Sequence, residues 1–144
     1  MNPIAVVISL LGLVVLSTAL GLVWRATTGR VRGAEGGRTI VRLSELRPDA
    51  PTGQAATLLQ FSTEVCAPCA NAHRTLEAVA GEFEAVRHVD VDVTARPDIA
   101  RRFGLLQSPT ILILDARGTV TARIGGLPRA AEVRAELDRI LGAA

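Results

Sequence analysis

The sequence predicts an α/β domain with a mixed central sheet flanked by helices, preceded by one transmembrane helix. The first part of the chain is a long apolar run without charges, and a glycine-rich stretch follows it. Beyond this stretch, short apolar runs typical of buried strands alternate with segments in which apolar residues recur at helical spacing. We therefore expect a transmembrane helix at residues 1–24, a flexible linker at 25–38 and a folded domain at 39–144.

Length and composition restrict the classes of function. The 144 residues allow one domain and an accessory segment, with enough apolar residues for a modest core. The net charge is only +2, and the chain has three Phe, one Trp and no Tyr. A nucleic-acid-binding protein typically shows a strong basic patch or stacking aromatic residues, so we expect no nucleic-acid partner.

The apolar run predicts a membrane anchor with a defined orientation. From Ile4 to Val23 the chain carries no charge, and at about 1.5 Å per residue this run spans the ~30 Å hydrocarbon core of a bilayer. Trp24 follows at the place of an interfacial anchor. Five arginines then come against one acid, Glu35; they are Arg25, Arg30, Arg32, Arg38 and Arg42. By the positive-inside tendency, the folded domain is expected on the cytoplasmic face.

Other interpretations of the apolar run remain open. A cleaved signal peptide would have a small-residue site at Ser17–Ala19, but a basic n-region is absent and the apolar run continues beyond this site. A buried core helix needs a shorter uncharged run. An extracytoplasmic domain is the alternative to the cytoplasmic one.

The elements before the cysteines are short. Residues 27–37 contain four glycines and no apolar periodicity, which predicts a flexible linker. Residues 39–43 are a candidate first strand. Pro48 and Pro51 interrupt residues 46–54, so no long helix is expected there. The apolar run at 56–61 predicts a buried strand.

The elements after the cysteines alternate between helix and strand. Helical spacing of apolar residues follows Cys66, and alternation at 88–93 predicts a strand. A short helix is expected at 98–103 and a buried strand at 110–114. A turn at 115–119 and a paired strand at 120–124 come next, and a last helix presents Val133, Leu137, Ile140 and Leu141. The order β, α, β, α, β, β, α implies a sheet with both parallel and antiparallel pairs.

The chemistry is concentrated in Cys66-Ala67-Pro68-Cys69, which contains the only two cysteines of the chain. A Cys-x-x-Cys pair that opens a helix places the first sulfur at the helix N-terminus, where free N–H groups and the helix dipole favour an anion. We therefore expect Cys66 to be a reactive thiolate. Cys69, one turn inward, can attack a mixed disulfide formed at Cys66 and release the reduced product.

Three other interpretations of the cysteine pair are open. A permanent structural disulfide over four residues stabilises by only ~2 kcal/mol in the chain-entropy model. A metal site would draw on Cys66, Cys69, His73 and His88, but their spacing matches no common zinc module. A redox-inert docking module would keep the fold and leave the cysteines without a role. Redox chemistry is favoured over all three.

Two sequence motifs resemble the thioredoxin family. Residues 58–69, Leu-Leu-Gln-Phe-Ser-Thr-Glu-Val-Cys-Ala-Pro-Cys, resemble its active-site strand and turn. Ser108-Pro109-Thr110 and the apolar run at 111–114 resemble its cis-proline loop and central strand, and Gly125-Gly126 resembles its glycine-containing loop. The resemblance covers about residues 39–141 and implies a thioredoxin-like fold. A Cys-x-x-Cys paired with a distal x-Pro-Thr is more specific than either motif alone.

The resemblance also implies roles for individual residues. Cys66 would be the attacking thiol and Cys69 the resolving thiol. Pro109 would follow a cis peptide bond and lie against the disulfide, and Ser108 would offer its backbone to an extended substrate segment. Gly125 completes the implied substrate-binding residues.

The sequence departs from the family pattern beside the cysteines. Gln60 stands where the family usually has a buried Asp that moves the proton of the resolving thiol, and an amide cannot do so. His88 stands near the usual Lys, and Arg74 replaces a helix-kinking Pro. The candidates for modulating the pKa of the cysteines are Gln60, Glu64, His73 and His88. For His73 and His88, the sequence favours ordinary helix and strand residues without a catalytic role. Asp90 and Asp92 are expected to be solvated charges.

We thus expect a membrane-tethered thiol:disulfide oxidoreductase that reduces protein disulfides. Pro68 at the third motif position resembles reducing members of the family, and the cytoplasm keeps thiols reduced. The expected partners are protein disulfide substrates, an unidentified electron donor and the membrane. No bound metal or other cofactor is expected, since the Cys66–Cys69 pair is itself the redox group.

Overall fold

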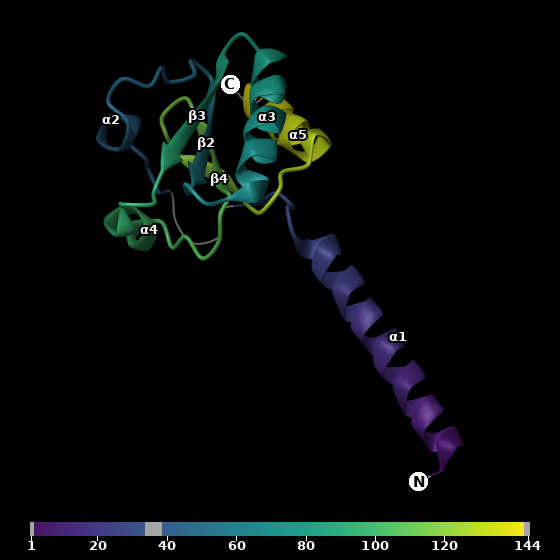
Figure 1. The fold of residues 1–144 in the computed structure, drawn as a ribbon. Helices are drawn as coiled ribbons and strands as arrows, with labels where there is room; N and C mark the ends of the chain where they lie inside the picture. Colours follow the sequence, from purple (N-terminus) through teal and green to yellow (C-terminus); the bar gives the residue numbers. More distant parts are fainter. Residues whose placement is uncertain (1, 34–38, 143–144) are drawn as a thin grey trace.

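The computed structural model describes residues 2–33 and 39–142, in which one long helix projects from an α/β domain (Figure 1). The helix, α1 (Pro3–Thr27), begins with the Asn2 side chain accepting a hydrogen bond from the Ile4 N–H. None of its residues is buried, and by length and composition it is a candidate membrane span. The hydroxyl of Thr18 donates to the Val14 carbonyl, which satisfies this polar group within the helix.

A five-stranded mixed sheet forms the centre of the domain, in the order β1-β5-β4-β2-β3. The strands are β1 (Arg32–Gly33), β2 (Ala56–Ser62), β3 (Val86–Asp92), β4 (Thr110–Asp115) and β5 (Val120–Gly125). β2 and β3 pair in parallel, and the other pairs are antiparallel. The predicted mixed sheet is thus confirmed.

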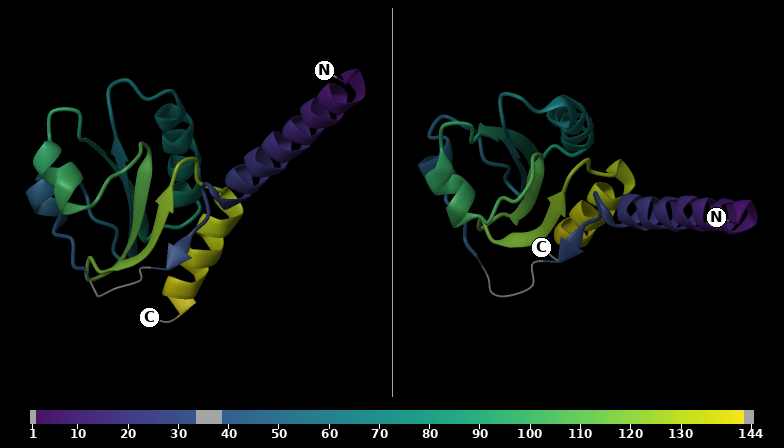
Figure 2. Two further views of the ribbon diagram at one scale, coloured as in Figure 1. Left: turned by 90° about the horizontal axis from the view of Figure 1, so that it is seen from below. Right: turned by 60° about the horizontal axis from the view of Figure 1, so that its bottom comes forward.

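Helices cover both faces of this sheet (Figure 2). On one face α3 (Ala67–Gly81) and α5 (Ala130–Gly142) pack on a core that includes Leu58 and Ile111. On the other, α2 (Leu43–Leu46) and α4 (Pro97–Arg102) pack on a core that includes Phe61. Because both faces are covered, β2 is buried over Ala56–Phe61, which is why its sequence is mostly apolar, with Thr57 and Gln60 as the polar exceptions, and does not alternate.

Residues 39–43 do not form the expected strand. Ile40 makes one isolated bridge to Thr119, and the chain then turns into α2. Leu43 and Leu46 lie three positions apart and are both buried against the core, so burial of this pair favours a helical turn.

The segment predicted to be a flexible linker differs from that expectation in its described part, residues 25–33. α1 continues to Thr27, the Gly29 N–H donates to the Gly125 carbonyl at 2.9 Å, and β1 pairs with β5. This pairing uses backbone groups and needs no apolar side chains, so hydrophobic periodicity gave no sign of it. The rest of the predicted linker, residues 34–38 with Glu35 and Arg38, lies outside the described residues.

Candidate active site

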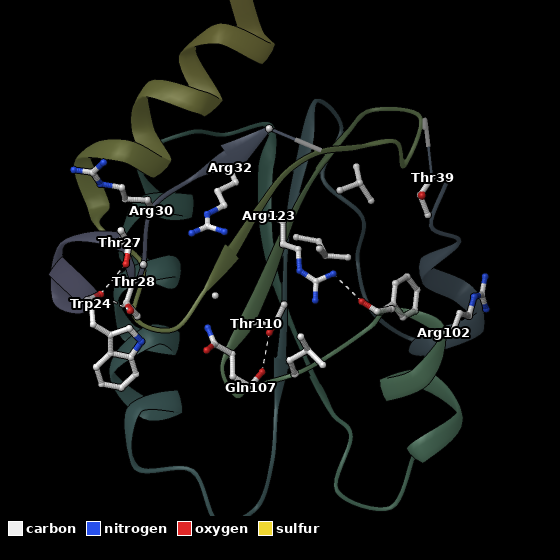
Figure 3. Close-up of a pocket in the computed structure, with 17 residues that line it drawn as sticks. Trp24, Thr27, Thr28, Arg30, Arg32, Thr39, Arg102, Gln107, Thr110 and Arg123 are labelled. Atoms are coloured by element: carbon white, nitrogen blue, oxygen red, sulfur yellow. Dashed lines mark hydrogen bonds between the residues drawn. The ribbon is translucent and has the colours of Figure 1, made fainter. Parts of the chain in front are cut away.

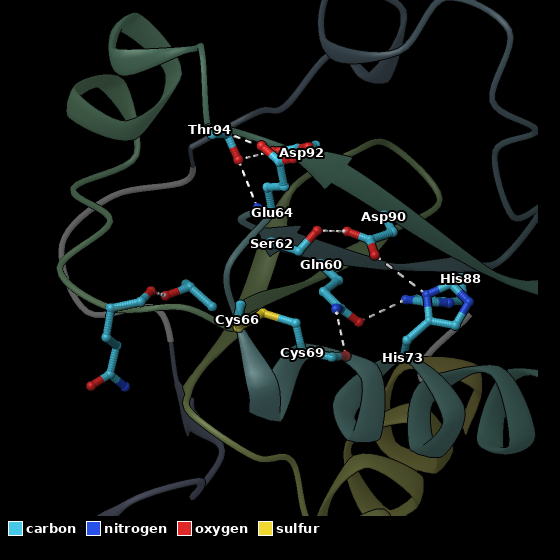
Figure 4. Close-up of a disulfide and its surroundings, with 12 residues drawn as sticks. Gln60, Ser62, Glu64, Cys66, Cys69, His73, His88, Asp90, Asp92 and Thr94 are labelled. Carbon is cyan, nitrogen blue, oxygen red and sulfur yellow. Dashed lines mark hydrogen bonds and ion pairs between the residues drawn. A yellow bond between two sulfur atoms is a disulfide. The ribbon is translucent and has the colours of Figure 1, made fainter.

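The two cysteines lie where the chain passes from β2 into the first turn of α3, at one end of the sheet (Figure 4). Cys66 is the N-cap residue of α3, and Pro68 lies in the first turn, where its missing N–H costs nothing. Cys66 and Cys69 form a disulfide with their Cα atoms 5.4 Å apart. Cys69 is only 6% exposed, whereas Cys66 is partly exposed. An incoming sulfur therefore has access to Cys66 rather than to Cys69.

The loop before β4 lies at the same end of the sheet. The Ser108–Pro109 peptide bond is cis, as predicted. β2 and β4 are antiparallel with Phe61 opposite Thr110, so the segment after β2 and the segment before β4 meet at one edge. The Gly126 N–H donates to the Pro109 carbonyl at 2.8 Å, which brings the glycine-containing loop to the same place. Gly125, an expected substrate-binding residue, has its carbonyl engaged by Gly29 of the same chain.

Gln60 lies beneath Cys69 and is fully buried. Its Nε2 donates to the Cys69 carbonyl at 3.2 Å, and its Oε1 lies 3.2 Å from His88 Nε2. Because the amide nitrogen is used at Cys69, the oxygen faces His88, and Nε2 of His88 carries the hydrogen. Gln60 therefore holds the first turn of α3 through the Cys69 carbonyl, and its two amide hydrogen bonds go to this carbonyl and to His88 rather than to a sulfur atom.

Three further polar side chains, His73, Asp90 and Ser62, form a chain of contacts that begins next to His88 (Figure 4). The rings of His73 and His88 lie edge to face with centroids 4.7 Å apart, and His73 Nδ1 is 3.3 Å from Asp90 Oδ2. The Ser62 hydroxyl donates to Asp90 Oδ1 at 2.5 Å. The expectation that Asp90 is merely solvated is wrong, because this carboxylate joins β2, β3 and α3.

The remaining candidates lie apart from this group. Asp92 accepts from Thr94, and this hydrogen bond lowers the pKa of its exposed carboxyl group. Glu64 is exposed, with its N–H donating to the Thr94 hydroxyl at 2.7 Å. Reasoning from sequence missed the part played by Ser62 and Asp90. The alternation of β3, which places His88, Asp90 and Asp92 on one side of the strand, was the available signal.

The suggested metal site is not assembled in the part of the chain that the structure describes. There, no group of three or more His, Cys, Asp and Glu side chains is placed to hold a metal ion. The two sulfur atoms are joined in a disulfide, and the His88 ring is hydrogen-bonded to the Gln60 side chain.

Comparison with known proteins agrees with this geometry. Residues 49–139, more than half of the chain, match the family model described as Thioredoxin. The chain belongs to the thioredoxin family. Its α/β fold with a mixed sheet and flanking helices is that of the family, and it carries a Cys-x-x-Cys pair at Cys66 and Cys69. α1 and β1 lie before the matched residues.

Individual relatives support the same assignment. The chain is 32% identical over 80 residues to the putative thioredoxin 2 of Streptomyces coelicolor, covering 56% of this chain and 60% of that protein. It is 33% identical over 69 residues to thioredoxin H2 of Arabidopsis thaliana, covering 48% and 51%. These matches thus span little more than half of each relative's length. The match to the SPbeta prophage-derived thioredoxin-like protein YosR of Bacillus subtilis, 35% over 85 residues, covers 58% of this chain and 92% of that protein.

Solved structures give the same fold. Chloroplastic thioredoxin z aligns with a TM-score of 0.57 and 25% identity, covering 69% of this chain and 87% of that chain. The thioredoxin of Trypanosoma brucei brucei aligns with a TM-score of 0.55 and 23% identity, covering 77% and 98%. The predicted thioredoxin-like fold is therefore confirmed.

The position of His88 in this thioredoxin-family site makes stability depend on pH. Desolvation by burial, and after it the neighbouring His73, lower the pKa of His88 to about 4, against the opposing pull of Asp90 and Glu77. Between about pH 4 and the ordinary value of 6.5, the unfolded chain binds a proton that the folded chain does not. The free energy of unfolding therefore decreases as the pH falls through this window.

We expect a decrease of about 1–2 kcal/mol, because the partly exposed ring is screened by solvent. Urea denaturation of the full chain in an uncharged detergent, at pH 7 and pH 4, measures it. His88→Gln removes the titrating group and is expected to show a smaller decrease. An equal decrease in both proteins would contradict the assignment to His88.

Proposed function

We propose that this chain is a membrane-tethered thiol:disulfide oxidoreductase that reduces protein disulfides through Cys66 and Cys69. The observation that carries the proposal is the arrangement of the pair at the start of α3, with a partly exposed Cys66 and a buried Cys69. A helix N-terminus favours the thiolate form of the exposed residue and thereby its reactivity as a nucleophile.

The proposed reaction proceeds in two exchange steps. In the reduced protein, the Cys66 thiolate attacks one sulfur of a substrate disulfide, forms a mixed disulfide and releases the other substrate sulfur as a thiolate. Cys69 then loses its proton and attacks Cys66, which releases the second substrate thiol. The substrate gains two electrons and the protein is left with the Cys66–Cys69 disulfide. A dithiol electron donor must reduce this disulfide before the next cycle.

The proposed substrate contacts come from the loop before β4. An extended substrate segment would lie along Ser108 and Pro109 and pair with the backbone of Ser108, as a strand added to the domain. Gly125 lies opposite Thr110 in the β4–β5 register, so it borders the same loop. The Gly29 N–H already holds the Gly125 carbonyl, so we assign the substrate hydrogen bond to Ser108 rather than to Gly125.

The group that accepts the Cys69 proton must differ from the buried carboxylate that the family usually provides. Gln60 cannot accept a proton, and His88 is half-buried and uncharged at neutral pH. We propose that the Cys69 proton leaves through water or through exposed polar groups such as Glu64, with Gln60 fixing the backbone of Cys69. This route predicts slower resolution than a buried carboxylate would give.

The proposed tether is α1, and the proposed location of the domain is cytoplasmic. The helix is apolar and unburied over Pro3–Thr27, and the arginines begin at its C-terminal end with Arg25. A charge pattern of this kind keeps the basic side in the cytoplasm. A signal sequence near the N-terminus can have the same length and apolar composition, so the experiment must distinguish a tether from a signal sequence.

Labelling of thiols in cells tests the tether and its orientation together. The full chain is expressed in a Gram-negative host, treated briefly with dithiothreitol, washed, and exposed to a membrane-impermeant maleimide before or after lysis. We expect the full-length protein in the membrane fraction, labelled only after lysis. The label should be lost in Cys66→Ser and retained in Cys69→Ser. Labelling of intact spheroplasts would overturn the cytoplasmic location, and a shortened soluble product would overturn the tether.

A further inference from the structure

A cavity of about 630 Å³ lies beside the base of α1 (Figure 3). It is bordered by the last turn of α1, by β1, β4 and β5, and by the loop between α4 and β4. Neither Cys66 nor Cys69 is among its lining residues. The lining residues on the α1 side come before residue 49 in the sequence, where the match to the family model begins. The cavity therefore depends on the N-terminal part of this chain.

The charge of the cavity is positive. Four arginines line it, namely Arg30, Arg32, Arg102 and Arg123, and no Asp or Glu among the described residues does. Arg102 is paired with Glu45 at 2.9 Å. Within residues 2–33 and 39–142, the other three form no ion pair. The positive charge that faces the cavity is therefore left largely uncompensated by that part of the chain.

Two of these arginines occupy opposing positions on adjacent strands. Arg32 of β1 lies directly opposite Arg123 of β5 in the antiparallel register. Like charges directly opposite one another destabilise a strand pair, and a bound anion between them would remove this repulsion. Arg123 is held in place, since its guanidinium donates to the carbonyls of Phe103 and Gly104 at 2.7 Å each.

Neutral hydrogen-bonding groups and exposed apolar side chains complete the lining. Gln107 extends its amide toward the cavity from the loop before β4, and Thr28 lies on the α1 side (Figure 3). Trp24 and Leu106 also line it, and they are 75% and 96% exposed. Arginine and amide groups suit a phosphate, whereas exposed apolar side chains beside them suit the glycerol and acyl part of an amphiphile.

We propose that this cavity binds the phosphate of an anionic phospholipid headgroup, between Arg32 and Arg123. The inference rests on the proposed tether, because a membrane-spanning α1 puts Trp24 at the depth of the headgroups. Anionic lipids of the cytoplasmic leaflet attract arginines at that depth. The bound lipid would fix the domain against the membrane surface through β1.

Trp24 provides the readout, since it is the only tryptophan of the chain. The full chain in dodecyl maltoside, which carries no phosphate, is titrated with dihexanoylphosphatidylglycerol while the fluorescence of Trp24 is followed. Parallel titrations use dihexanoylphosphatidylcholine, which controls for lipid mixing with the micelle, and sodium phosphate. We expect a saturable change with phosphatidylglycerol at concentrations about tenfold lower than with phosphatidylcholine or phosphate.

Substitutions at β1 then assign the site. Arg32→Gln is expected to weaken phosphatidylglycerol binding about tenfold, since it removes one charged donor from an exposed position. A matched control, Arg74→Gln combined with Arg139→Gln, removes two charges from α3 and α5 on the other face of the sheet and is expected to bind as the native chain does. Arg32→Glu places a carboxylate opposite Arg123, so it should abolish binding and raise the thermal midpoint of the lipid-free protein.

Each other outcome contradicts the proposal. If phosphate alone saturates the signal at the concentrations that phosphatidylglycerol requires, the ligand is a free phosphate and the lipid assignment fails. If Arg32→Gln titrates like the native chain, the site is elsewhere. Insulin reduction assayed in the same micelles separates this result from the proposed function: a redox-active protein with no saturable lipid response refutes only the lipid site.

Discussion

Replacing Cys66 with serine should abolish reduction of protein disulfides, a loss of about 10³-fold or more relative to the native chain. The hydroxyl of serine does not form the mixed disulfide, and Cys69 is too buried to take over the attack, at 6% exposure. Reduction of insulin by the full chain in detergent micelles, with dithiothreitol as the electron donor, measures the loss.

Cys69→Ser is the matched control for this experiment. It keeps the attacking thiol and removes the resolving one, so it should also stop turnover but accumulate a mixed disulfide between Cys66 and the substrate. A redox-inert docking module would lose nothing with either substitution. Retained turnover in Cys66→Ser, or a mixed disulfide at Cys69 instead of Cys66, would contradict the assigned order of attack.

The fold was predictable from sequence where burial controls the pattern. β2 and β4 are covered on both faces, so each is a short, mostly apolar run without alternation that can be recognised without a structure. The Cys66 N-cap position follows from a Cys-x-x-Cys placed directly between a buried strand and a helical pattern. The cis peptide before Pro109 was also expected, from the resemblance to the thioredoxin family rather than from the composition of the loop.

Features that rest on backbone pairing or on long-range polar contacts were not predictable. β1 consists of Arg32 and Gly33, which have no strand-like pattern, and its place at the sheet edge depends on hydrogen bonds to β5. The contact of Asp90 with His73 and Ser62 joins residues 17 and 28 positions apart. No local rule connects such positions, because the fold brings them together only after the sheet has formed.

The reduction potential of the Cys66–Cys69 pair is expected to lie near that of thioredoxin. Thioredoxin lies at about −270 mV and a strong disulfide donor at about −120 mV, a difference of about 7 kcal/mol for a two-electron couple. A strong oxidant requires a reduced form that is greatly stabilised. In this chain the first turn of α3 supplies the helix N-terminus at Cys66, and the buried side chain beneath Cys69 is the neutral Gln60, which adds no positive charge. We therefore expect the dithiol to remain a good reductant.

The most direct test measures the reduction potential of the Cys66–Cys69 pair in the full chain in uncharged detergent. The protein is equilibrated with dithiothreitol and glutathione redox buffers, and the free thiols are quantified by alkylation. A midpoint near about −270 mV is the result that a protein-disulfide reductase predicts. A midpoint near about −120 mV would show a disulfide donor and contradict the proposed direction of the reaction.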